Sequence, residues 1–261
     1  MPATTGPIAS PPSTDIATTA PYRTVDAKVY LVRDGRLTIA HRQVEAPAVL
    51  RHSLAALFAG ATPAETAAGL SSEIPAGTVL QDVAVGDGVA TIDVSGRFDD
   101  GGGSLSMQAR LTELVFTATQ FPEVTAVTLQ LDGTAITTLG GEGLDVSGPL
   151  GRAQMPRDIT GSVLVDTPVP GQTVGPTFTV TGEADVFEAE FPIEVWSGDT
   201  MIGGVTGVRG GAWGSWATFE TTITVSAPAG PIRLVAYDPG GCGTEPECPV
   251  PIRTEVELHL V

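Results

Sequence analysis

The chain has 261 residues, with 30 acidic and 13 basic side chains and a formal net charge of −17. This balance excludes binding to a nucleic-acid backbone or an anionic membrane surface, both of which need clustered Lys and Arg. Residues 1–150 hold 16 acidic and 8 basic side chains, and residues 151–261 hold 14 and 5, so no single acidic tail is indicated. The 42% hydrophobic content supports real cores, while 32 Gly and 21 Pro favour many turns and short strands.

Residues 1–22 are rich in Thr, Pro and Ala and cannot bury a core, so the sequence predicts a disordered tether there. No segment reaches the roughly 18 consecutive apolar residues of a membrane helix. A tether ahead of folded domains suggests that the chain derives from an exported precursor. We expect membrane attachment only through a lipid anchor encoded upstream of this sequence.

The two cysteines, Cys242 and Cys248, lie in a Gly/Pro-rich loop and allow two interpretations. A zinc site would need further ligands, and His259, on an expected strand, is the one candidate nearby. A short-range disulfide is favoured instead, which implies an oxidising compartment.

Residues 23–150 mix helical and strand-like patterns and predict an α+β domain. The first expected element is a short strand at 29–32, ended by Asp34-Gly35. The remaining elements are a helix with apolar residues at 50, 54, 57 and 58; a short helix with a capping box at Thr62 and Glu65; a hairpin of 78–85 and 89–94; the longest helix, from Ser104 to before Phe121; and a strand pair beginning at Val124 and turned at Asp132-Gly133.

Residues 151–158 are taken as a linker within a Gly-rich joint, and beyond it the helical period disappears. Short strand-like runs between Pro/Gly turns predict an all-β immunoglobulin-like sandwich over residues 159–261. The expected strands lie at 162–165, 178–180, 193–196, 219–225, 232–237 and 255–260, with a hairpin region at 203–207.

Several short sequence segments resemble segments of known bacterial domains. In the first half these are residues 29–31, 69–78 (GLSSEIPAGT), 89–95 (VATIDVS), 116–122 (FTATQFP) and 127–133 (VTLQLDG). Their order and spacing resemble the GerMN domain of sporulation and spore germination proteins. Residues 168–174, 180–188 and 216–220 resemble the immunoglobulin-like domain that often follows it.

The resemblance implies a non-catalytic, extracytoplasmic and often lipid-anchored protein of a Gram-positive, actinobacterial-type envelope. GerMN domains are similar to ring-building modules that self-associate or bind neighbours, so self-association is expected. An envelope protein or a cell-wall component is the implied partner. The alternative is a cell-wall (peptidoglycan) enzyme or an accessory domain of one.

Catalytic and metal motifs are missing from the sequence: it holds no G-x-S-x-G, no H-E-x-x-H and no twelve-residue calcium loop. We therefore expect no enzyme activity, no cofactor and no metal, with structural roles for His41 and His52. Two acidic groups could bind calcium weakly, but a solvated turn and a solvated strand edge are favoured. These groups are Asp99-Asp100 and the set Glu183, Asp185, Glu188 and Glu190.

Trp213 and Trp216 lie three residues apart among glycines, which suggests a loop or a strand end. Exposed, either ring could stack on a glycan or a partner protein, since aromatic residues anchor many interfaces. Burial of at least one in the sandwich core is the favoured alternative. Both residues are therefore candidate contacts for a glycan or a partner protein.

Overall fold

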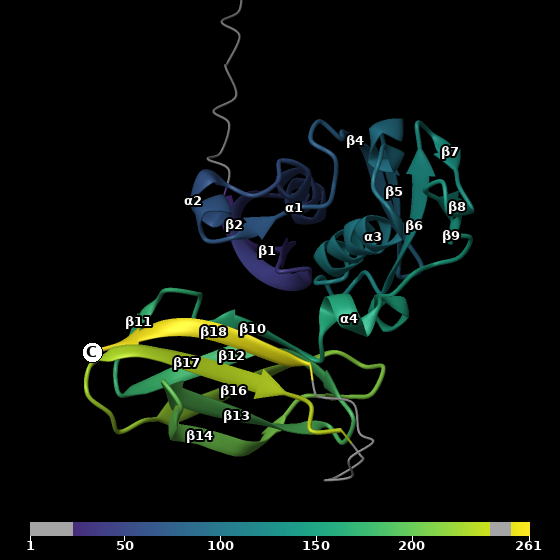
Figure 1. Ribbon diagram of the computed structural model, residues 1–261. Coiled ribbons are helices and arrows are strands. Elements are labelled where there is room, and N and C mark those ends of the chain that lie inside the picture. Colours follow the sequence, from purple (N-terminus) through teal and green to yellow (C-terminus); the bar gives the residue numbers. More distant parts are fainter. Residues whose placement is uncertain (1–22, 241–251) are drawn as a thin grey trace, which may run out of the picture.

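The computed structural model describes residues 23–240 and 252–261 (Figure 1). They form two domains, an α+β domain and a β-sandwich below it in this view, with the short helix α4 (Arg157–Thr160) between them. This arrangement confirms the predicted fold class. The predicted tether and the Cys242–Cys248 disulfide lie outside the described residues.

The first domain begins with a long hairpin of strands β1 and β2. The two pair antiparallel from Arg23 opposite Ala46 to Arg33 opposite Arg36, and Asp34 and Gly35 close the turn at positive φ. The sequence predicts only a short strand at 29–32, but β1 has 11 residues. Residues 29–32 are buried without alternation, because two helices of the domain pack against β1 and the second domain adds Glu183, which contacts the Tyr30 hydroxyl. The strand bounds are β1 Arg23–Arg33, β2 Arg36–Ala46 and β3 Leu70–Ser71.

The helices of the first domain start and end close to where the sequence places them. Thr62 and Glu65 form the predicted capping box, in which each side chain accepts from the other's backbone N–H. Helix α3 connects the parallel strands β5 and β6 and lies between the two sheets of the domain. The helices are α1 Val49–Phe58, α2 Pro63–Ala67, η1 Gly96–Asp99 and α3 Ser104–Ala118.

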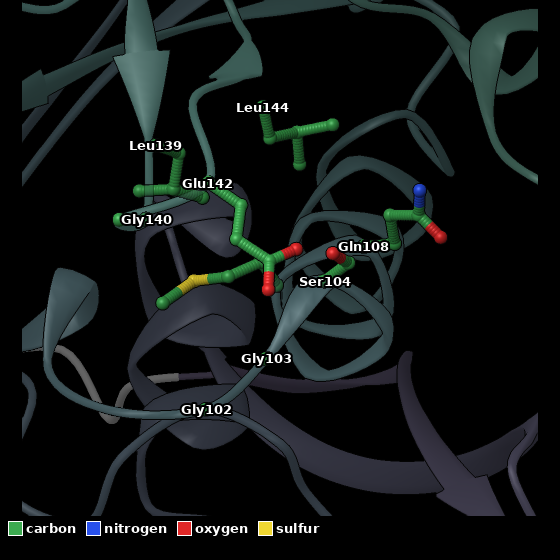
Figure 2. Close-up of a pocket in the computed structure, with 10 residues that line it drawn as sticks. Gly102, Gly103, Ser104, Gln108, Leu139, Gly140, Glu142 and Leu144 are labelled. Atoms are coloured by element: carbon green, nitrogen blue, oxygen red, sulfur yellow. The ribbon is translucent and has the colours of Figure 1, made fainter.

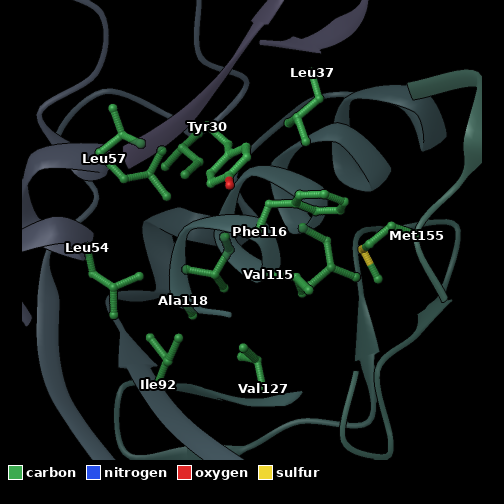
Figure 3. Close-up of a cluster of buried hydrophobic side chains, with 14 of the residues drawn as sticks. Tyr30, Leu37, Leu54, Leu57, Ile92, Val115, Phe116, Ala118, Val127 and Met155 are labelled. Carbon is green, nitrogen blue, oxygen red and sulfur yellow. The ribbon is translucent and has the colours of Figure 1, made fainter. Parts of the chain in front are cut away.

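The second sheet of this domain has the order β4-β5-β6-β7, with the predicted turns at Asp87-Gly88 and Asp132-Gly133. Its inner residues pack with α1, α3 and β1 into one core, in which Phe116 lies beside Tyr30 (Figure 3). The strands of this sheet are β4 Leu80–Gly86, β5 Val89–Val94, β6 Ala126–Leu131 and β7 Thr134–Ala135. The strands β8 Thr138–Leu139 and β9 Leu144–Asp145 form a separate antiparallel pair.

The joint contains η2, Arg152–Gln154, and α4, Arg157–Thr160. Met155, within the expected linker, and Ile159, at the expected start of the second domain, are both buried here and contribute apolar contacts to the first domain.

The second domain is a sandwich of two sheets with its own apolar core. One sheet holds β10, β12, β15 and β16, and the other has the order β11-β18-β17-β13-β14. The region expected as a hairpin at 203–207 is part of the ten-residue edge strand β14, whose glycines hide its strand character. Gly203 is required there, since a Cβ would lie 2.9 Å from the Thr224 carbonyl oxygen. The strands are β10 Val163–Thr167, β11 Thr173–Val174, β12 Thr177–Val186, β13 Glu190–Ser197, β14 Thr200–Arg209, β15 Gly211–Ala212, β16 Ala217–Thr224, β17 Gly230–Tyr237 and β18 Arg253–Leu260.

Candidate functional site

Charged side chains from both domains and the joint meet where the domains touch. We call this group the junction cluster; its members are Lys28, Tyr30, His41, Arg152, Asp166 and Glu183. Strands β1 and β2 supply the first three, η2 supplies Arg152, and β10 and β12 supply the two acids.

Glu183 is the centre of the junction cluster. Its carboxylate accepts hydrogen bonds from Lys28 Nζ and Tyr30 Oη, each at 2.9 Å, and forms an ion pair with Arg152. Burial favours the neutral acid, but the charges of Arg152 and Lys28 outweigh it and hold the pKa of Glu183 below its usual value. The buried charge is therefore matched by two cations, as a charge in a protein interior requires.

Lys28 connects Glu183 to Asp166, the second acid of the junction cluster. Its Nζ lies 3.0 Å from Asp166 as well as 2.9 Å from Glu183. Burial opposes the charge on the amine, yet the two carboxylates outweigh burial and raise the pKa of Lys28. The chain's single lysine is thus held between two acids of the other domain.

His41 bridges one carboxylate of each domain. Its Nδ1 lies 2.6 Å from Asp26 and its Nε2 lies 2.5 Å from Asp166. The hydrogen bond to Asp166, together with that to Asp26, outweighs burial and raises the pKa of His41 to about 9. Both ring nitrogens therefore donate, and the imidazolium links β2 to β10.

Apolar contacts flank the junction cluster. Trp216 of the second domain packs edge-on against Phe116 of α3, with ring centroids 5.1 Å apart. Arg152 lies over the same Phe116 ring at 4.6 Å, while its Nε donates to Thr119 Oγ1 at 2.8 Å. Leu164 of β10 is part of the first domain's core and Trp216 packs against that core, so the second domain contributes apolar side chains to it.

Trp213, three residues earlier, lies on the surface with 62% of its area exposed. The Arg157 guanidinium covers it at 3.9 Å from the ring centroid, and Phe187 stands beside it. Asp185 is buried and joins these segments: it pairs with Arg157 at 2.7 Å and accepts the Gly214 N–H at 2.8 Å.

The expectation of a solvated acidic strand edge is wrong for Glu183 and Asp185. Both are buried, because the first domain and the joint cover the end of β12 and supply Lys28, Arg152 and Arg157 as partners. Glu188 and Glu190 are exposed as expected. Among the described residues, no group of three or more His, Cys, Asp and Glu side chains could hold a metal ion.

A second buried carboxylate, Glu113, lies inside the first domain on α3. It accepts from Ser72 Oγ at 2.5 Å and from the Glu73 N–H at 2.7 Å, so it holds part of the GLSSEIPAGT segment. Burial raises its pKa to about 8. The sequence pattern did not identify this residue, because Glu113 lies off the apolar stripe of Leu111, Leu114, Val115 and Ala118, where a glutamate is expected to face solvent.

The two remaining histidines are hydrogen-bonded to backbone or exposed. His52 Nδ1 lies 2.6 Å from the Glu45 carbonyl oxygen, and His259 is exposed on β18. A hollow of about 170 Å³ lies at the start of α3, where Glu142 points toward Ser104 (Figure 2). Within the described residues, no helix is long and apolar enough to cross a membrane.

Comparison with known proteins agrees with the two-domain division. The family model for sporulation and spore germination (Germane, or GerMN) matches residues 22–137, and that for the immunoglobulin-like domain of bacterial spore germination (Gmad2) matches residues 162–241. No curated protein matches the chain significantly.

Solved structures with similarity include the first GerMN domain of the sporulation protein GerM from Bacillus subtilis, at 23% identity, 49% of this chain, 98% of that chain and a TM-score of 0.40. The tandem GerMN domains of the same protein match at 16% identity, over 77% of this chain and 61% of that chain, with a TM-score of 0.43. A presumed lipoprotein from Clostridium perfringens matches at 22% identity, over 54% of this chain and 97% of that chain, with a TM-score of 0.39. The two family models together establish that this chain is a GerMN domain of the sporulation and spore germination family followed by the immunoglobulin-like domain of bacterial spore germination.

Proposed function

We propose that the protein is a non-catalytic binding and assembly module of a bacterial cell envelope, outside the cytoplasm and lipid-anchored in an actinobacterial-type organism. Its partner is an envelope protein or a cell-wall component. The family descriptions, both from sporulation and germination, and the Thr/Pro/Ala composition of residues 1–22 support this placement.

The junction cluster is the observation that carries the proposal. Lys28, His41 and Glu183 are the side chains best suited to acid–base chemistry. Each of them is instead engaged in an ion pair between the two domains. Glu183 accepts from three donors, and both nitrogens of His41 face carboxylates. Such an arrangement fixes one domain against the other, which serves a scaffold that presents surfaces to partners.

Incubation with purified peptidoglycan separates this role from the enzyme alternative. We expect no release of soluble fragments at any pH between 5 and 9. Glu113, the buried acid whose pKa is raised to about 8, is the acid to replace first. Fragment release that disappears in Glu113→Gln, but persists in the exposed-site control Glu142→Gln, would overturn the proposal.

Strand β4 supports the assembly part of the proposal. It is an outer strand of its sheet, and most of its residues are exposed. Antiparallel pairing with a second copy, centred on Ala84, sets Val83 opposite Val85 and Asp82 opposite Gly86, so no like charges meet. We propose that copies associate through this edge.

Light scattering at increasing concentration tests this association. We expect the wild type to form dimers or larger species and Ala84→Lys, a charge placed on the edge, to remain monomeric. The matched control is Thr200→Lys, on an edge strand of the other domain. A wild type that stays monomeric at high concentration removes the self-association proposal.

A further inference from the structure

Trp213 and Phe187 form an exposed corner of two aromatic rings. They are 62% and 50% exposed, their centroids lie 6.3 Å apart, and their planes meet at 79°. The Trp213 ring can therefore form the floor of a binding site and the Phe187 ring its side wall. The corner lies beside the joint but shares no residue with the junction cluster.

The Trp213 ring is held in place by its surroundings. Gly211 allows the tight turn before it, since a Cβ there would lie 1.6 Å from the Ser215 carbonyl oxygen. The Ser215 N–H donates to the Ala212 carbonyl at 2.8 Å, and the Gly214 N–H donates to Asp185. Arg157, fixed by the same Asp185, stacks on the indole at 3.9 Å.

Phe187 is also fixed through its backbone. Its N–H donates to Asp238 Oδ2 at 3.0 Å, in the turn between β12 and β13. Aromatic residues whose backbones are held by hydrogen bonds lose less conformational entropy when a ligand binds, which favours a binding role.

The size of the corner indicates the class of ligand. The residues beside these rings are small or charged: Ala212 and Gly214 flank Trp213, and Glu188 and Ala189 follow Phe187. A stable protein interface buries about 1,200–2,000 Å² in total, which two isolated rings do not approach. A pyranose ring needs far less, because its C–H face covers a single indole and its hydroxyl groups reach polar atoms at the rim.

We propose that Trp213 and Phe187 form a saccharide-binding corner, in which a neutral pyranose stacks on the indole against the phenyl wall. Asp185 and Arg157 contact the Trp213 turn and ring from the side of the joint. This inference rests on the proposed envelope function, because it specifies the cell-wall component named there as a sugar. The occupant is a sugar ring of an envelope glycan, and exposed Glu188 is a hydroxyl acceptor at the rim.

Titration with N-acetylglucosamine tetramer and with cellotetraose, followed by the three tryptophan indole N–H signals in NMR, tests the corner. Addition up to about 10 mM is suitable, since a site of one stacked ring binds in the millimolar range. We expect a saturable shift of the Trp213 signal with at least one oligomer, while those of Trp196 and Trp216 move little.

The affinities of substituted proteins provide a second test. Phe187→Ala should weaken binding roughly tenfold, the loss of about 1.4 kcal/mol of contact, and Trp213→Ala should abolish it. Trp213→Phe should retain part of the affinity. Met201→Ala, which removes a side chain 58% exposed elsewhere in the domain, is the matched control and should bind as the wild type does. Binding by the alanine variants is read from the remaining backbone signals of residues 210–216.

Absence of a saturable shift with both oligomers, or an unchanged affinity in Phe187→Ala and Trp213→Ala, would overturn the saccharide-binding corner. Neither result affects the non-catalytic role or the self-association, which the peptidoglycan and light-scattering experiments test separately. Turnover with intact sugar binding would instead remove the non-catalytic role and leave the corner.

Discussion

Two buried glutamates show how the interior of the first domain differs from its junction with the second. Glu113 accepts from a hydroxyl and a backbone N–H, and burial raises its pKa to about 8. Glu183 is also buried, but two cations and a tyrosine hydroxyl surround it, and its pKa falls below the usual value. The neutral form of Glu113 is favoured, because burial outweighs the charge of Arg110, whereas Glu183 stays charged because two cations form ion pairs with it.

The difference teaches that burial alone does not set the role of an acid in this protein. Within the first domain, Glu113 ties one loop to α3. At the junction, Glu183 ties three parts of the chain together through charge. Substitution of each acid by its amide should therefore have different consequences.

The largest effect is expected for Glu183→Gln. It leaves Lys28 and Arg152 without their buried counter-charge, which costs about 3–5 kcal/mol when one partner of a buried pair is removed. Urea unfolding at neutral pH measures this loss. The control is Glu188→Gln, an exposed acid on the turn that follows the same strand. A loss below about 1 kcal/mol would show that the junction does not depend on charge.

Glu113→Gln should change the pH dependence of stability instead. Because the folded pKa is raised to about 8, the contribution of Glu113 is full below the unfolded value near 4.5 and is lost as pH rises from there to 8. The variant should lack this loss, which is at most about 1.4 kcal/mol per pH unit. Urea midpoints of the two proteins across that window provide the measurement, and parallel curves would contradict the prediction.

Trp216→Ala separates apolar contact from charge at the junction. Removal of a half-buried ring that packs on Phe116 should destabilise the protein by about 2 kcal/mol, below the range for a fully buried tryptophan. Trp213→Ala removes the same side chain from the surface and should cost less. Thermal unfolding of both variants makes the comparison, and equal losses would show that Trp216 contributes no packing.

The smallest effect is expected at His41, on the exposed rim of the junction cluster. Its raised pKa of about 9 means that its contribution is full below about 6.5 and is lost as pH rises through 9. Asp26, Asp166, Lys28 and Gln43 surround it, and of these only the carboxylates favour the imidazolium.

His41→Gln should flatten the fall in thermal midpoint over that alkaline window. His52→Gln, whose ring bonds to a backbone carbonyl, is the control and should follow the wild-type curve. A wild-type midpoint that is flat across the window would show that His41 does not hold the domains together.

Sequence patterns predicted the local structure well, because it depends on neighbouring residues. The capping box at Thr62 and the Asp-Gly turns act over two to four residues, and the structure places them as expected. The junction was beyond such patterns. Lys28 and Glu183 are 155 residues apart, and the alternation of β12 gives no sign that another domain covers its end. The glycines of β14 concealed a strand for a related reason, since what they avoid is a clash with the distant Thr224.

The position of Lys28 has a practical consequence for following the two domains in solution. It is the chain's only lysine, and its amine lies between two carboxylates with 21% of the side chain exposed. An acylating reagent that modifies only lysine ε-amines that are free and deprotonated would meet a protonated, hydrogen-bonded group while the domains are closed. Mass spectrometry of a single peptide would then count the fraction of molecules in which the joint has opened, with no engineered label.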